Sequence, residues 1–62
     1  MKRSELLKYL RSYGCELLRE GKRHSWWYNP VLNKRSAIPR HREIKDILAI
    51  KICKDLDIPS IK

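Results

Sequence analysis

The stretch from Gly21 to Pro30, GKRHSWWYNP, holds the densest set of residues in this chain that are suited to chemistry. His24 carries an imidazole, a side chain whose usual pKa of about 6.5 lets it exchange protons near neutral pH. The cations Lys22 and Arg23 precede it and attract phosphate, and the aromatic rings at 26–28 offer faces on which unpaired bases stack. Together these side chains indicate an RNA site.

The same stretch also has a plainer interpretation. It can be a β-strand whose aromatic side chains pack into a core, with a surface histidine ahead of it. Because single histidines are common, this stretch alone favours the plainer interpretation. The rest of the chain has to decide between the two.

The composition points to a small domain with a polyanionic partner. With 62 residues, we expect one domain spanning 1–62 with a thin core, which excludes multi-domain enzymes with deep pockets. Lys and Arg number 15 against 7 for Asp and Glu, so the net charge is +8. Such an excess destabilises a small fold by self-repulsion, so we expect it to serve a partner, with nucleic acid as the first candidate and an acidic protein as the second.

No segment suggests a membrane or a secretion route. No run approaches the ~20 apolar residues of a membrane span. The first residues, MKRSELLKYL, lack the uninterrupted apolar region of a signal peptide. We therefore predict a cytoplasmic protein without membrane contact.

The cysteines and histidines do not form a metal-binding pattern. Cys15 and Cys53 are far apart in sequence and each lies among apolar neighbours, so we predict buried free thiols rather than a disulfide. A zinc site using His24 and His41 would need ligands from four scattered elements, whereas structural zinc usually binds close pairs. We predict no metal and no cofactor.

The first element is predicted to be an amphipathic helix over about residues 3–13, with Ser4 as one choice of N-cap. Gly14 is suited to the left-handed conformation that ends a helix. The apolar face consists of Leu6, Leu7, Leu10 and Tyr13.

Three short strands follow, at residues 15–19, 25–29 and 35–38. Pro30 and Pro39 end the second and third strands because proline cannot donate to a ladder, and Asn33 suits a left-handed turn position between them. Strands joined by such short loops form an antiparallel meander.

The last element is predicted to be a more apolar helix, with Asp46 as its N-cap or in its first turn. Its apolar residues are Ile44, Ile47, Leu48, Ile52 and Leu56, widened by Ala49, Ile50 and Cys53. The order is then helix, three strands, helix. It predicts a two-layer α+β sandwich, with both helices on one face of a three-stranded antiparallel sheet and the other face free.

Two motifs connect this pattern to a known family. The first is GxxHxxWxxP at Gly21, His24, Trp27 and Pro30, and the second is IPRHREIK at residues 38–45. In this order, together with ELLKYLRSYG at 5–14 and IKICKDLDI at 50–58, they resemble the HicA (YcfA-like) toxin family. The resemblance implies an α-β-β-β-α fold like that of double-stranded-RNA-binding domains. It also implies an mRNA-cleaving toxin that a HicB-like antitoxin neutralises.

The resemblance assigns the catalytic role to His24, which matches the family's catalytic histidine, and so favours the RNA site over the plainer interpretation. Metal-free RNA cleavage needs a group that takes the proton of a 2′-hydroxyl or gives one to the leaving 5′-oxygen. The sequence shows no second acid–base partner. The chain departs from many family members at Ile47-Leu48, where they often carry Gly-Thr, and at Asp57, where they end in glycine.

The predicted RNA contacts come from both motifs and from the loop between them. Arg40 suits phosphate because of its guanidinium fork, whereas His41 is equally well explained as an RNA contact or as a loop or cap histidine. Trp26 and Trp27 face opposite sides of a strand, so the stacking ring is not assigned; Trp27 holds the motif position. The predicted RNA-binding residues are Lys22, Arg23, Trp27, Lys34, Arg35, Arg40 and His41.

Two other functions fit the same composition. The first alternative is a non-catalytic module of the double-stranded-RNA-binding type that uses the same basic face. The second is a structural subunit whose charge serves an acidic protein partner.

Overall fold

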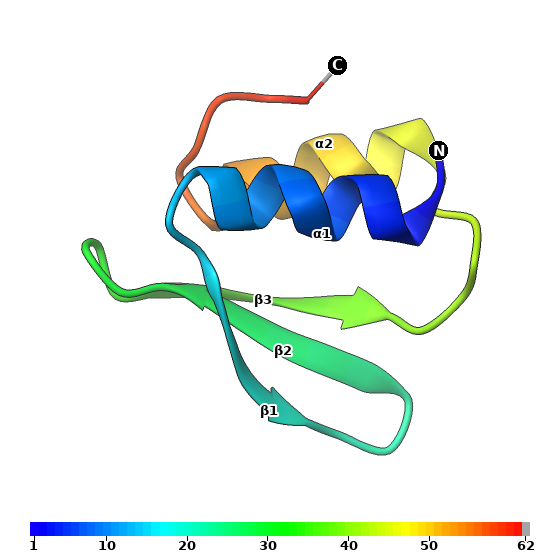
Figure 1. Ribbon diagram of the computed structural model, residues 1–62, viewed down its shortest axis with the longest axis horizontal. Coiled ribbons are helices and arrows are strands. Elements are labelled where there is room, and N and C mark those ends of the chain that lie inside the picture. The colour runs from blue at the N-terminus through cyan, green and yellow to red at the C-terminus, as the bar shows by residue number, and fades with distance from the viewer. Residues whose placement is uncertain (62) are drawn as a thin grey trace.

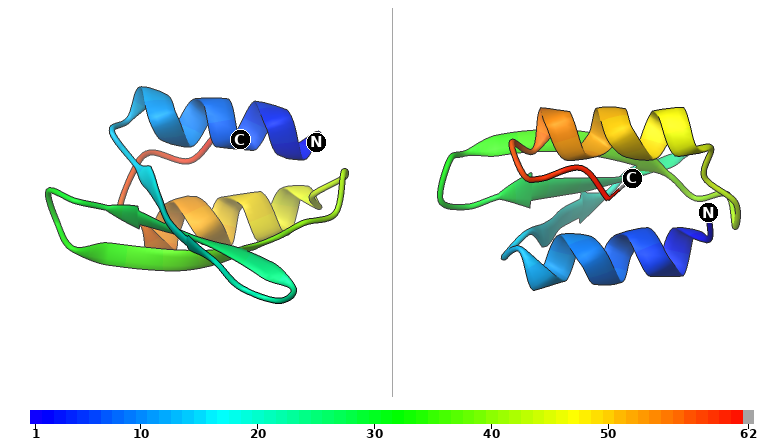
Figure 2. Two further views of the ribbon diagram at one scale, coloured as in Figure 1. Left: turned by 60° about the horizontal axis from the view of Figure 1, so that its bottom comes forward. Right: turned by 90° about the horizontal axis from the view of Figure 1, so that it is seen from above.

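The computed structural model, which describes residues 1–61, contains two helices and one three-stranded sheet (Figure 1). Along the chain these are α1 (Arg3–Ser12), β1 (Glu16–Glu20), β2 (His24–Asn29), β3 (Lys34–Pro39) and α2 (Asp46–Asp55). The strands lie in the order β1-β2-β3, and both pairs are antiparallel. The helices lie side by side against one face of the sheet (Figure 2). The predicted two-layer α+β sandwich with the order α-β-β-β-α is confirmed.

Helix α1 buries a narrow apolar face. Leu6, Leu7 and Leu10 are buried, as the spacing predicts, but Tyr13 lies beyond the helix and is 47% exposed. Ser4 is not the N-cap: that position is Lys2, which makes no capping hydrogen bond with its side chain. Gly14 has φ = +83°, so the predicted left-handed residue after the helix is confirmed.

Helix α2 buries a face that is narrower than predicted. Ala49, Ile52, Cys53 and Leu56 are buried, at the i, i+3, i+4, i+7 spacing of one helical stripe. The prediction for Ile47 is wrong: it is 77% exposed, because two residues before Ala49 lies about 200° around the helix. Ile50 is also exposed and Leu48 is half-buried. Asp46 lies in the first turn, and Lys45 is the N-cap.

Polar contacts fix the end of the sheet at which β2 turns into β3. Asn29 is buried, and its Nδ2 donates to the carbonyl of Leu56, which ends α2, at 3.0 Å. Its Oδ1 accepts from the backbone N–H of Val31 at 3.1 Å, starting the turn. Asn33 then takes the predicted left-handed conformation, with φ = 54°. One side chain therefore joins the turn to the helix.

The two cysteines are buried and free, as predicted. Burial raises the pKa of Cys15, with a smaller contribution from Cys53. Over the residues that the structure describes, no helix is long and apolar enough to cross a membrane.

Candidate active site

A basic hollow of about 540 Å³ lies at the end of the sheet where β1 turns into β2. Two segments line it: the turn leading into β2, and the end of β3 with the loop that follows. Register brings them together, because His24 is paired with Pro39. The lining residues are Lys22, Arg23, His24, Pro39, Arg40 and His41. Four of the predicted RNA-binding residues thus line one hollow with the predicted catalytic histidine.

His24 is exposed because of its position in β2. Side chains alternate along this strand, and His24 shares the open face of the sheet with Trp26 and Tyr28. The turn before it is closed by a hydrogen bond of 2.8 Å from the N–H of Gly21 to the carbonyl of His24. A Cβ at Gly21 would lie 3.1 Å from that carbonyl oxygen. The close approach explains why a glycine suits this position.

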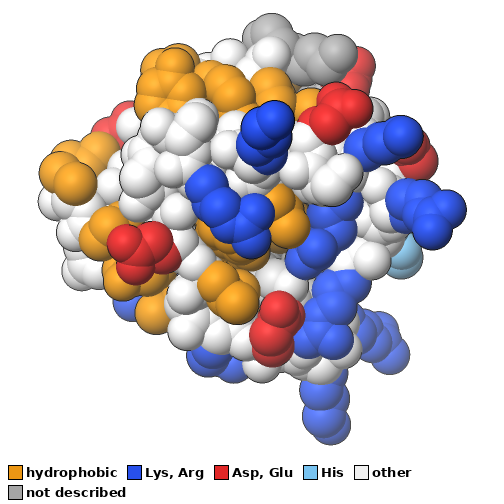
Figure 3. Space-filling model, viewed as in Figure 1, with side chains coloured by type: hydrophobic (Ala, Val, Ile, Leu, Met, Phe, Trp, Pro, Cys, Tyr) orange, Lys and Arg blue, Asp and Glu red, His pale blue; other side chains and the backbone are white. Residues whose placement is uncertain are grey.

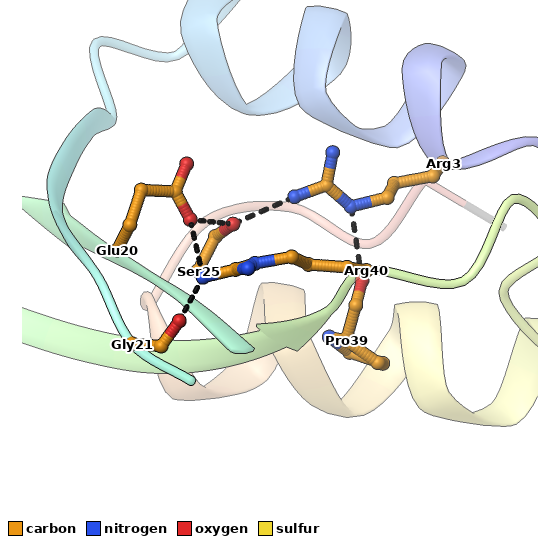
Figure 4. A network of polar contacts seen from close by, with 6 residues as sticks. All are labelled: Arg3, Glu20, Gly21, Ser25, Pro39 and Arg40. Carbon is orange, nitrogen blue, oxygen red and sulfur yellow. Dashed lines mark hydrogen bonds and ion pairs between the residues drawn. The ribbon is translucent and has the colours of Figure 1, made fainter. Parts of the chain in front are cut away.

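Arg40 ties the two walls of the hollow together (Figure 4). It belongs to the loop after β3, but its guanidinium donates to the carbonyl of Gly21 in the opposite turn. The same group pairs with the carboxylate of Glu20 at 3.3 Å. The predicted phosphate contact at Arg40 is therefore already engaged, and the residue braces the turn that precedes His24.

A buried serine extends this brace to α1. The Oγ of Ser25 donates to Oε1 of Glu20 at 2.6 Å and accepts from Nη2 of Arg3 at 2.8 Å. The Nε of Arg3 donates to the carbonyl of Pro39 at 2.9 Å. The hydrogen bond from Ser25 lowers the pKa of Glu20, and the charges of Arg40 and Arg3 add to this, against a smaller opposing effect of desolvation. Glu20 is thereby held as a carboxylate at the centre of four segments.

A second basic hollow, of about 460 Å³, adjoins the first and shares Arg40 with it. It lies where α1 begins beside the loop before α2. There the backbone N–H of Arg3 donates to the carbonyl of Arg42 at 2.8 Å. Figure 3 shows Lys and Arg side chains gathered over this side of the molecule. The residues that line this second hollow are Lys2, Arg3, Ser4, Arg40 and Arg42. The sequence prediction missed this hollow because its cations come from segments about forty residues apart, which only the fold brings together.

Trp27 does not fit its predicted role as an RNA contact. It is 2% exposed and lies in the core, with the guanidinium of Arg11 5.0 Å from its ring centroid. Its position on the helix-facing side of β2 leaves no ring face for a base. The half-buried Trp26, next along the strand, is the tryptophan on the open face, 5.6 Å from the guanidinium of Arg19.

Lys34 and Arg35 are exposed but lie at the other end of β3. Lys34 and Pro39 are five positions apart in sequence, which is roughly 16 Å along a strand. Neither lines either hollow. The structure therefore does not bring them together with His24, although Arg35 shares the open face.

Within residues 1–61, no group of three or more His, Cys, Asp or Glu side chains is placed to hold a metal ion. The acid–base groups that line the first hollow are the two imidazoles, alongside Lys22, Arg23 and Arg40. Lysine and arginine side chains keep their protons at neutral pH. The arrangement is suited to holding phosphate and transferring protons.

A family model described as "HicA toxin of bacterial toxin-antitoxin" matches residues 3–58. No curated protein matches the chain, and no solved structure does. The match covers both hollows except Lys2, and it covers every predicted site residue.

Proposed function

The chain belongs to the family of HicA toxins of bacterial toxin–antitoxin systems, as its motifs predict, and from this premise we propose that it is a metal-independent ribonuclease that cleaves mRNA with His24. Toxins of this family generally act on RNA. The observation that carries the proposal is the position of His24. It is the first residue of β2 on the open face, and it lines a hollow with cations from two segments.

The chemistry of the hollow suits a phosphodiester. Lys22 and Arg23 would hold the phosphate by charge, and His24 would take or give the proton that the displacement requires. His24 is exposed, so RNA can reach it without a rearrangement of the core. Positioning of the RNA strand in the hollow would supply much of the remaining rate enhancement.

The RNA backbone would run from the first hollow to the second. Arg40 lines both, so a strand that crosses it meets Lys2 and Arg42 next. On the open face beside His24, Trp26 offers a ring for an unpaired base. Arg35 would meet only a longer RNA, because it lies at the far end of β3.

The antitoxin would silence the toxin by covering the same surface. We expect an acidic protein of the HicB type whose surface overlies His24, because complementary charge guides association with a basic partner. Its binding should weaken as the salt concentration rises. A complex that leaves His24 open to RNA would contradict this account of inhibition.

The proposed function is tested by single-turnover cleavage of an unstructured RNA, with and without EDTA. His24→Ala should abolish cleavage yet bind RNA within a few-fold of wild type. Removing the charge of Lys22 or Arg42 should instead weaken binding and reduce its salt slope by about one for each phosphate that is no longer neutralised. Lys34→Ala is the matched control, since Lys34 is exposed but outside both hollows.

Two outcomes would overturn the mechanism. The first is full cleavage by His24→Ala, and the second is activity lost to EDTA and restored by a divalent ion. Either outcome would mean that another group or a metal ion performs the cleavage. Absence of cleavage by the wild-type protein, with RNA binding intact, would instead favour the non-catalytic RNA-binding module.

A further inference from the structure

We propose that His41 is the second catalytic residue of the first hollow, and that His24 and His41 divide between them the two proton transfers of RNA cleavage. This inference rests on the proposed function of the site. It assigns to His41 a role in the reaction itself, beyond contact with RNA.

Placement is the first observation. His24 and His41 line the same hollow but belong to the two different segments that form its walls. His24 is paired with Pro39, and His41 follows Pro39 by two residues, so the register of β2 with β3 keeps the histidines at one end of the sheet. Both are exposed and can reach a bound strand.

Both neighbours of His41 make contacts with other segments, Arg40 through its side chain and Arg42 through its backbone, which is the second observation. The preceding residue, Arg40, donates to the carbonyl of Gly21 and pairs with Glu20 in the opposite wall. The carbonyl of the following residue, Arg42, accepts from the N–H of Arg3 at 2.8 Å. His41 is therefore presented to the hollow by a braced segment, as a group that must be positioned would be.

The composition of the lining is the third observation. Besides the two imidazoles, the hollow is lined by Lys22, Arg23, Pro39 and Arg40. Lysine and arginine are residue types poorly suited to proton exchange near neutral pH, and proline has no side-chain proton to transfer. Among the lining residues, His41 is thus the group suited to act opposite to His24.

Cleavage needs two transfers at once, and the pair balances them. The 2′-oxygen attacks phosphorus, forming the O2′–P bond, while the P–O5′ bond breaks. One imidazole, neutral at the start, takes the proton of the 2′-hydroxyl, and the other, protonated at the start, gives one to the leaving 5′-oxygen. The products are a 2′,3′-cyclic phosphate and a 5′-hydroxyl, no proton is gained or lost, and exchange with water resets the pair.

The charges around the pair are mostly positive. Lys22 and Arg23 precede His24 in the turn, and Arg40 and Arg42 flank His41. Glu20 pairs with Arg40, and Lys2 and Arg3, at the start of α1, line the second hollow. Arg3 and Arg40 are engaged in the brace, so Lys22, Arg23 and Arg42 would bind the phosphate that the two imidazoles act on.

The test compares His24→Ala, His41→Ala and His41→Gln on two RNAs, one normal and one in which sulfur replaces the bridging 5′-oxygen at the cleaved bond. Sulfur leaves without a proton, so it rescues loss of the general acid and not loss of the general base. We expect each alanine variant to lose about 10²–10⁴-fold in single-turnover rate on the normal RNA. We expect the sulfur substrate to restore one of them and not the other.

The pH profile and a conservative variant separate catalysis from binding. Wild type should show a bell-shaped rate profile across the range in which imidazoles exchange protons, and His41→Ala should lose one limb of it. His41→Gln keeps hydrogen bonding without proton transfer, so it should be as slow as His41→Ala while binding RNA within a few-fold of wild type. Thermal melts of all variants confirm folding.

The outcomes distinguish this inference from the proposed function. If His24→Ala is inactive while His41→Ala or His41→Gln cleaves within about threefold of wild type with an unchanged pH profile, the role of His41 is overturned and that of His24 stands. Rescue of neither alanine variant by sulfur overturns the pairing as well. If both alanine variants cleave normally, the proposed function itself fails.

Discussion

Strand β2 places its six side chains alternately on two faces of the sheet, and the two faces differ in what surrounds them. Ser25, Trp27 and Asn29 face the helices and are buried, Trp27 to 2% exposure. His24 is exposed on the other face, and Trp26 beside it is half-buried. Because the period of a strand is two, a slip of one residue would exchange these sets. The candidate site is thus positioned by the same register that builds the core.

The face of the sheet that packs against the helices also supports the site, through its polar residues. Ser25 is bonded to Arg3 and Glu20, and so connects the core to the brace behind His24. Asn29 connects the opposite end of the strand to α2. Trp27 is different, because its Nε1 is buried without a hydrogen-bond partner among the described residues. On this face, then, the polar side chains fix the sheet relative to the helices, and the large apolar ring fills the core.

The largest expected contrast lies between neighbours on the two faces. Trp27→Ala should destabilise the protein by about 3–5 kcal/mol, because it removes a buried ring and leaves a cavity. For a domain of this size, that leaves little or no folded protein at 37 °C. His24→Ala should leave the melting temperature within a degree or two of wild type while abolishing cleavage. Thermal melts of the two variants measure this, and equal destabilisation by both would contradict the division of β2 into a core face and a site face.

The same contrast can be drawn on α2 with one residue type. Ile52 is 1% exposed, so Ile52→Ala should reduce the free energy of unfolding by about 2–5 kcal/mol. Ile47 is 77% exposed, so Ile47→Ala should change it by less than about 0.5 kcal/mol. Denaturant melts of both variants give the two values. A large loss of unfolding free energy in Ile47→Ala would mean that Ile47 packs against the core and is not exposed.

These two isoleucines show which features of α2 could be predicted from sequence and which could not. Periodicity located the helix and most of its core, since Ile52 and Leu56 are buried as predicted. It did not fix the width of the buried face, because a run such as ILAIKI is apolar nearly all round, and only packing against the sheet selects a stripe. Asp57 shows the opposite case. It stands where many family members have glycine, and it adopts φ = 57° after α2.

The candidate site was predictable where its residues are adjacent in sequence. The glycine, cations and histidine of the turn form one motif, and register brings the second motif to it through Pro39. Alternation also placed the two tryptophans on opposite faces, but it could not say which face the helices cover. The second hollow and the brace were beyond prediction, because Arg3, Ser25 and Glu20 share no local pattern.

The open face should contribute to RNA binding rather than to stability. If a base stacks on Trp26, Trp26→Ala should weaken RNA binding by about 1–3 kcal/mol, and Trp26→Phe should retain most of it because a ring remains. Fluorescence titration with an unstructured RNA measures both. Equal binding by wild type and Trp26→Ala, with normal melting, would remove Trp26 from the RNA path and leave binding to the cations.

The smallest expected effect concerns the brace, the polar contacts among Arg3, Glu20, Ser25 and Arg40. This effect should depend on pH. The hydrogen bond from Ser25, with the charges of Arg40 and Arg3, holds the pKa of Glu20 below its ordinary value of 4.5 in the folded protein. Above about pH 4.5 the carboxylate is ionised in both the folded and unfolded states, so its stabilising contribution is fully present. As the pH falls from 4.5 through the lower folded pKa, that contribution is lost.

Glu20→Gln should therefore lower the melting temperature at neutral pH by a small amount, because the group is exposed to screening by solvent. The difference from wild type should shrink below about pH 4.5 and vanish in stronger acid. Melts of both proteins from pH 7 to pH 3 measure it, with Ser25→Ala as the matched variant, since it removes the main cause of the lowered pKa. A difference that stays constant over this range would mean that the charge of Glu20 does not stabilise the brace. The position of His24 would then depend on Arg40 and the carbonyl of Gly21 instead.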